Sequence, residues 1–183
     1  MSFTAGFYDI DVRHGHAHWR DLEVKSLRHE RILPLASPEY LRKQYDYKFE
    51  LGKAKLLRDG AEVLIISSGI MTMRALEVAK ALEADRVGVA VLHVPTIKPL
   101  DTETIVREAS RAGRLVIVAE NHTTIGGLGE AVATSLMTAG VAVPFRQIAL
   151  PDKFLDAGAL PTLHDRYGVS TAVMSANIKN WLA

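Results

Sequence analysis

The sequence has no cysteine, few aromatic residues and no long apolar run. The lack of cysteine excludes disulfides, thiolate metal sites and thiol nucleophiles, and it fits a reducing compartment. Apolar stretches such as Val87 to Val94 are far shorter than the roughly 20 residues that a membrane helix needs. Residues 1–10 lack the cationic start and apolar run of a signal peptide. We therefore expect a cytoplasmic protein that does not span a membrane.

The chain also has almost no excess of one sign of charge over the other. The 22 basic and 21 acidic residues nearly cancel, and neither sign forms a long block. A basic stripe that follows phosphates is typical of nucleic-acid-binding proteins, so the charge pattern predicts no nucleic-acid partner. With 183 residues, 48% of them hydrophobic, the chain is long enough for one core and an extension.

From Glu62 onward, short apolar runs alternate with longer helical patterns. This alternation predicts an α/β fold, with a parallel sheet that helices cover on both faces. The runs are rich in Val, Ile and Leu, which is typical of strands buried on both sides. The predicted strands are Lys53 to Leu57, Val63 to Ser67, Val87 to Val94, Leu115 to Glu120 and Val143 to Leu150. The predicted helices are about Met71 to Glu83, Asp101 to Ala112, Gly127 to Ala139 and Thr171 to Leu182, the last with Ser170 as its N-cap.

Residues 1–44 differ from the rest of the chain. They have mixed charge and no clear strand or helix period, so we interpret them as an N-terminal extension or linker before a domain of residues 45–183. His14, His16 and His18 alternate, so on an extended segment all three would point to one side and could bind a transition metal. Adventitious binding of nickel or zinc is the competing interpretation, and we assign no metal site.

Polar residues follow three of the predicted strands. Open α/β sheets bind ligands at the carboxyl ends of their strands, beside the point where the strand order reverses. The candidates are therefore Ser67, Ser68 and Gly69 after one strand, His93 after the next, and Glu120, Asn121 and His122 after the third. The serines either hydrogen-bond a phosphate or cap the following helix. No G-x-S-x-G elbow surrounds them, which disfavours serine hydrolase chemistry.

A glycine-rich stretch opens the next predicted helix. Gly126, Gly127 and Gly129 lead into N–H groups that could receive an anion. The stretch is not a full dinucleotide fingerprint, because Val132 stands where the third glycine would be, and no G-K-[ST] follows for a Walker A loop. The alternative is that the glycines only allow tight packing of the helix start against the sheet. For His122, direct proton transfer and an interface role both stay open.

Several stretches together resemble a known family. They are Phe49 to Gly60, Val63 to Ser67 with Gly69, Pro95 to Asp101, Glu120 with His122, Ile125 to Gly129, and Pro151 to Phe154 with Gly158. In this order and spacing they resemble the C-terminal domain of transketolase-like enzymes, over about Tyr45 to Ala183. That group includes 1-deoxyxylulose-5-phosphate synthase and the β chains of 2-oxo acid dehydrogenases.

The resemblance implies a three-layer α/β/α sandwich with a five-stranded mixed, mostly parallel sheet. The first strand would be antiparallel to the others, and the strands that begin at Val63 and Leu115 would be neighbours. Two polar segments would then share one crevice. We assign no catalytic residue, and we assign to this crevice the substrate-binding candidates Glu120, Asn121, His122, Gly126, Gly127 and Gly129, with Ser67, Ser68 and His93 as outer members.

Members of the family act as dimers that hold thiamine diphosphate and magnesium between two other domains, with a G-D-G motif in one of them. This chain has no G-D-G, so we expect the complete enzyme to bind thiamine diphosphate and magnesium and this chain alone to bind neither. The expected function is that of the C-terminal domain or subunit of a transketolase-type transferase. Its role would be scaffolding and contact with cofactor-binding domains or a cofactor-binding subunit, in a homodimer or hetero-oligomer.

Two other functions stay open. The first is an independent binding module that captures a small phosphorylated metabolite in the same crevice. The second is an inactive remnant that is retained as a dimerisation unit. The sequence alone does not choose between a natural subunit, a truncated product and a fragment.

Overall fold

The computed structural model describes residues 47–183. The predicted extension of residues 1–44 and its alternating histidines, His14, His16 and His18, lie outside this range, so the domain boundary at residue 45 stays a prediction. Within the described range, no helix has the length and apolar character needed to cross a bilayer.

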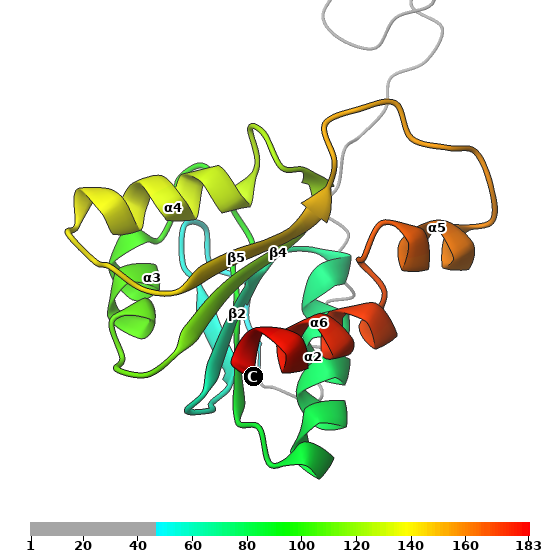
Figure 1. Ribbon diagram of the computed structural model, residues 1–183. Coiled ribbons are helices and arrows are strands. Elements are labelled where there is room, and N and C mark those ends of the chain that lie inside the picture. Colours follow the sequence, from blue (N-terminus) through cyan, green and yellow to red (C-terminus); the bar gives the residue numbers. More distant parts are fainter. Residues whose placement is uncertain (1–46) are drawn as a thin grey trace, which may run out of the picture. The chain divides into compact units, whose positions relative to one another are not determined.

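Five strands form one mixed sheet in the order β1-β3-β2-β4-β5 (Figure 1). The strands are β1 (Lys55–Arg58), β2 (Val63–Ser67), β3 (Val89–His93), β4 (Leu115–Thr123) and β5 (Phe145–Leu150). β1 pairs antiparallel with β3, and the other pairs are parallel. The predicted antiparallel first strand is confirmed, and so is the predicted contact between β2 and β4. The strand order reverses between β2 and β4, because β3 adds to one side of β2 and β4 to the other.

Helices cover both faces of this sheet. α3 and α4 lie on one face, and α2 and α6 lie on the other (Figure 1), which confirms the predicted three-layer sandwich. The helices are α2 (Ile70–Leu82), α3 (Thr102–Ala109), α4 (Leu128–Thr138), α5 (Leu160–Arg166) and α6 (Thr171–Leu182), with a 3-10 turn, η1 (Glu83–Asp85), after α2.

Two apolar clusters hold the layers together. β2 and β3 are buried along their whole length, as their continuous apolar runs predict. Because side chains alternate along a strand, Val63 and Ile65 join the cluster on the α2 side, whereas Leu64 and Ile66 join the cluster on the α3 and α4 side. α6 adds Met174 and Ile178 to the first cluster, so it packs on α2 within this domain.

Several element boundaries differ from the prediction, and one helix was not predicted. β4 continues past the predicted end at Glu120 to Thr123, with an irregular register between Ala119 and Thr123, so Asn121 and His122 belong to the strand and not to a turn after it. α3 ends at Ala109, before the predicted Ala112. α5 was not predicted, because its seven residues bury no side chain and therefore leave no apolar period in the sequence.

Side chains cap two helices, and the sequence predicts one of these caps, Ser170. Ser170 accepts a hydrogen bond from the N–H of Val173 at the start of α6. Asp101 accepts one from Thr104 at the start of α3 (3.1 Å) and a second from the N–H of Ala54 (2.9 Å). The second bond ties the chain that leads into β1 to the connection between β3 and α3.

A buried arginine organises the amino edge of the sheet, where the parallel strands begin. Arg114 is 2% exposed. It donates to the carbonyl oxygen of Gly60 (2.6 and 3.0 Å), to that of Glu108 (3.1 Å) and to the carboxylate of Asp59 (2.7 Å). The turn between β1 and β2 is thereby fixed to the end of α3.

Candidate functional site

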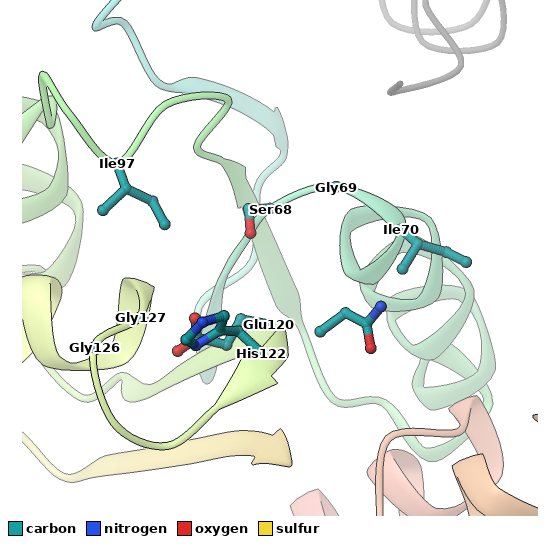
Figure 2. A pocket seen from close by; sticks show the side chains of 9 residues that line it. Ser68, Gly69, Ile70, Ile97, Glu120, His122, Gly126 and Gly127 are labelled. Atoms are coloured by element: carbon teal, nitrogen blue, oxygen red, sulfur yellow. The ribbon is translucent and has the colours of Figure 1, made fainter. Parts of the chain in front are cut away.

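A pocket of about 310 Å³ opens at the carboxyl edge of the sheet, beside the ends of β2 and β4 (Figure 2). It lies where the strand order reverses, which is where open α/β sheets bind ligands. The lining residues are Ser68, Gly69, Ile70, Ile97, Glu120, Asn121, His122, Gly126 and Gly127. The two polar segments that the resemblance places in one crevice therefore do meet.

The innermost acidic residue of this pocket, Glu120, caps a helix. Its side chain is almost completely buried, at 1% exposure. One carboxylate oxygen accepts from the N–H of Leu128 and the other from the N–H of Gly129, both at 2.7 Å. The side-chain amide of Gln147 donates to it as well, at 3.2 Å. The carboxylate thus satisfies the free N–H groups of α4 and faces the positive end of its dipole.

This cap corrects one interpretation of the glycine-rich stretch. The N–H groups at the start of α4, which the sequence offered to an external anion, are occupied by the protein's own carboxylate. A Cβ atom on Gly127 would lie 2.1 Å from Oε2 of Glu120, and one on Gly129 would lie 2.2 Å from the amide nitrogen of Gln147. These two glycines let the carboxylate and the amide approach the helix start. The packing interpretation therefore holds for both.

Gly126 has a different reason to be glycine. Its φ is +76°, in the left-handed region, and its N–H donates to the carboxylate of Glu130 at 2.6 Å. No atom lies within 4 Å of where its Cβ would be, so the constraint is the backbone conformation and not space.

His122 is exposed and lines the pocket (Figure 2). Nδ1 lies 3.1 Å from the carbonyl oxygen of Thr123. Because a carbonyl only accepts, Nδ1 is the donor in this contact. The hydrogen bonds of Glu120 among residues 47–183 go to α4 and Gln147. The carboxylate therefore does not orient the imidazole as a general base would require.

Two predicted outer members, Ser67 and His93, lie in the core and not in the pocket. Ser67 donates to the hydroxyl of Thr72 (3.1 Å), and that hydroxyl lies 2.8 Å from Nδ1 of His93. The ring of His93 is 1% exposed and packs edge-on against Tyr47, with centroids 5.1 Å apart. Burial lowers the pKa of His93 to about 4. This histidine is therefore neutral at pH 7 and belongs to a buried polar chain below α2.

Strand alternation explains this correction. Ser67 and His93 are partners in the β2–β3 register, and both point to the same face as Val63 and Ile65, toward α2. Ser68, one position further on, does line the pocket. Gly129 does not line it, because it lies behind Glu120 in the first turn of α4.

Neither serine caps α2. The N-cap is Gly69, with φ +53°, no side chain accepts a capping hydrogen bond from the backbone N–H groups of the first turn, and this turn has no acidic residue. The positive end of the α2 dipole is therefore not compensated from within the helix, and it faces the pocket rim at Ser68.

Sequence reasoning missed Ile70 and Ile97 at the pocket. Both are exposed, at 52% and 43%, and both line it. The signal that was available is their place in the connections that follow β2 and β3. The period of a helix or strand does not predict exposure for an apolar residue at a helix start, such as Ile70, or in a loop, such as Ile97.

The described residues do not fit a diphosphate bound through magnesium. No group of three or more His, Asp or Glu side chains within residues 47–183 could hold a metal ion. None of the nine lining residues is Lys or Arg, and the α4 N-terminus already binds Glu120. Thiamine diphosphate and magnesium therefore find no diphosphate site in this pocket.

The fold and the pocket together define a class of protein. These are the three-layer α/β/α domains with a mixed sheet and a pocket at the point where the strand order reverses. Residues 52–174 match the family model described as "Transketolase, C-terminal domain". This match covers more than half of the chain. The chain belongs to the transketolase family, and it contains the family's C-terminal domain.

Named relatives agree with this assignment. A "putative uncharacterized transketolase family protein y4mN" of Sinorhizobium fredii is 66% identical over 140 residues, which are 76% of this chain and 41% of that protein. The "6-deoxy-6-sulfo-D-fructose transketolase subunit SqwH" of a Clostridium species is 41% identical over 123 residues, 67% of this chain and 38% of that subunit. The chain thus matches well under half the length of either relative.

A solved structure is similar as well. It is described as a "split gene transketolase, inactive beta4 tetramer", and it superposes with a TM-score of 0.67 at 36% identity. The similarity covers 74% of this chain and 44% of that one. The relatives therefore contain a large part with no counterpart in the described domain.

Proposed function

We propose that this chain is the C-terminal part of a transketolase-type, thiamine diphosphate-dependent transferase. In this proposal it contributes scaffolding and contact with a cofactor-binding domain or subunit, and that partner binds thiamine diphosphate and magnesium. The observation that carries the proposal is the Glu120 cap, because it fills the one glycine-rich helix start of the domain with an internal carboxylate. A position that is occupied for stability is not available for a cofactor phosphate.

The lengths of the relatives support the same proposal. The matched residues are 38% to 41% of two transketolase-type proteins, so the remainder of such a protein is large enough for at least one further domain. The split-gene relative supports assembly from separate chains. A cytoplasmic location and a homodimeric or hetero-oligomeric state belong to this proposal.

Reconstitution tests the proposal. The partner in this test is the part of the y4mN protein that lies outside the match, produced as a separate polypeptide and supplied with thiamine diphosphate and magnesium. We expect no ketol transfer from either polypeptide alone and measurable transfer after mixing, with a complex visible by gel filtration. If mixing restores no activity and gives no complex, the assignment as an enzyme part is wrong.

A second candidate function is the capture of a small phosphorylated metabolite in the pocket. The uncapped start of α2 favours it, because the positive end of that helix faces the rim at Ser68. The lack of lysine and arginine among the lining residues disfavours it. Calorimetry of the unmixed chain with a sugar phosphate decides the matter, since saturable heat at micromolar concentrations would favour the binding module.

A further inference from the structure

Large apolar side chains are exposed mainly at one edge of the sheet. Residues 47–183 contain ten such side chains, and eight lie at the carboxyl edge or in the chain that leads into β1 there. After β2, β3 and β4, each connection exposes one isoleucine, and the connection after β5 exposes three side chains. They are Ile70, Ile97, Ile125, Phe154, Leu155 and Leu160, which we call the carboxyl-edge apolar surface.

The opposite edge of the sheet has the character of a solvent-facing surface. Ion pairs hold its turns, among them Arg58 with Glu83 and Arg111 with Asp59. The two exposed large apolar residues outside the carboxyl edge, Met137 and Leu182, stand alone near helix ends. Single apolar residues on a surface are normal, whereas apolar residues gathered on one face mark an interaction site.

The segment between β5 and α5 exposes apolar side chains, although hydrogen bonds fix its backbone to the end of α5. Asp156 accepts hydrogen bonds from Arg166 (2.8 Å) and from the hydroxyl of Tyr167 (2.9 Å), and its own N–H donates to that hydroxyl (2.9 Å). These bonds clamp the segment to the end of α5. Phe154 is nevertheless fully exposed, and the segment extends away from the sheet (Figure 1). A loop that is fixed internally and exposes a phenylalanine fits a partner better than it fits solvent.

The chain joins the domain at this same edge. Tyr47 packs against His93 at the end of β3, and the following segment exposes Phe49 and Leu51. That segment is held to the β3–α3 connection by the bond from the N–H of Gly52 to Thr96 (3.1 Å). Any domain that is linked through the residues before Tyr47 is therefore attached beside the carboxyl-edge apolar surface.

From these observations, and resting on the proposed function, we infer that the carboxyl-edge apolar surface is where the cofactor-binding part of the enzyme packs. The entry of the chain at this edge favours that occupant over a second copy of the chain, and the size of the unmatched part of the relatives provides enough surface to cover it. The pocket then lies inside the contact, with Ile70 and Ile97 on its rim.

Single charge substitutions test the inference, with the same y4mN polypeptide as the binding partner. Ile97→Lys and Phe154→Lys each place a charge in the proposed contact, and we expect each to weaken binding at least about tenfold in a calorimetric titration. Met137→Lys is the matched control, because Met137 is 80% exposed at the other end of α4. We expect its affinity to stay within about twofold of the unsubstituted chain.

Three results would overturn the inference while leaving the proposed function in place. The first is binding that both carboxyl-edge variants retain, in folded form by circular dichroism. The second is binding that Met137→Lys weakens as much as they do. The third is a dimer of the unmixed chain that Phe154→Lys converts to a monomer in sedimentation equilibrium, because a second copy would then cover this surface. If the unsubstituted chain shows no binding at all, the proposed function fails together with the inference.

Discussion

Removing the buried carboxylate at the start of α4 should destabilise the domain strongly. In Glu120→Ala, the N–H groups of Leu128 and Gly129 lose their acceptor inside the protein, where Leu128 is fully buried. An unpaired buried donor costs about 1–3 kcal/mol, so two of them with the lost side-chain packing give about 3–5 kcal/mol. Domains of this size are stable by about 5–15 kcal/mol, so the loss is a large fraction of the total.

Glu120→Gln is the more specific variant. It keeps one oxygen acceptor and nearly the same volume, but it turns an amide N–H₂ toward the second backbone donor and removes the charge that faces the α4 dipole. We expect a loss of about 2–3 kcal/mol. Glu130→Gln is the control on the same loop, because Glu130 is exposed and accepts one bond, from Gly126. Its expected loss is below about 1 kcal/mol.

Urea unfolding followed by circular dichroism measures the loss of stability in both variants. The free energy of unfolding must fall with urea concentration at the same slope in each variant, because only then do the midpoints compare stability. The reasoning is refuted if Glu120→Gln loses no more stability than Glu130→Gln. In that case the carboxylate does not hold α4, and a role for Glu120 toward a ligand would have to be considered instead.

Three further predictions concern stability and pH. Gly127→Ala places a methyl group against the Glu120 carboxylate and should cost about 1–3 kcal/mol in urea unfolding, whereas Gly158→Ala, with its nearest neighbouring atom 3.6 Å away, should change stability by less than about 0.5 kcal/mol. The pKa of His93 is about 4 in the folded domain and about 6.5 in the unfolded chain, so between these pH values the unfolded state binds one proton more than the folded state. The free energy of unfolding should therefore fall by up to about 3 kcal/mol from pH 6.5 to pH 4. His93→Asn should remove this part of the pH dependence. Arg114→Lys cannot reach all three acceptors of the buried guanidinium and should cost about 2–4 kcal/mol; an unchanged melting temperature would contradict the assigned network.

The strands and the fold class were predictable because they depend on local composition. The runs at β2 and β3 contain almost only Val, Leu, Ile and Ala, and a run of that kind is stable only where both faces are covered. The cap at Ser170 was also visible, because a capping side chain and its N–H lie within three residues. Asp101 caps α3 in the same way, but it was predicted to lie inside that helix. Such contacts are short enough for a sequence to reveal them.

The chemistry of the pocket was less predictable because it depends on contacts between distant residues. Glu120 meets Gln147 across 27 positions, and it meets Leu128 and Gly129 across eight and nine positions, in a part of β4 whose register is irregular. A sequence shows only a polar residue after an apolar run, and that pattern fits a cap and a ligand site equally. His93 was misplaced for a simpler reason, since its parity with Val89 and Val91 already pointed it toward the core.

The packing of Tyr47 limits how short this polypeptide can be made. The family match begins at Gly52, yet the aromatic ring five positions earlier is 94% buried, with 6% exposed, and closes the cluster over His93. A polypeptide that begins at Gly52 would lack the Tyr47 ring and would have a cavity beside the neutral imidazole of His93. Aromatic deletions from a core cost about 3–5 kcal/mol, so a fragment for crystallography or for fusion to another enzyme half should keep the tyrosine.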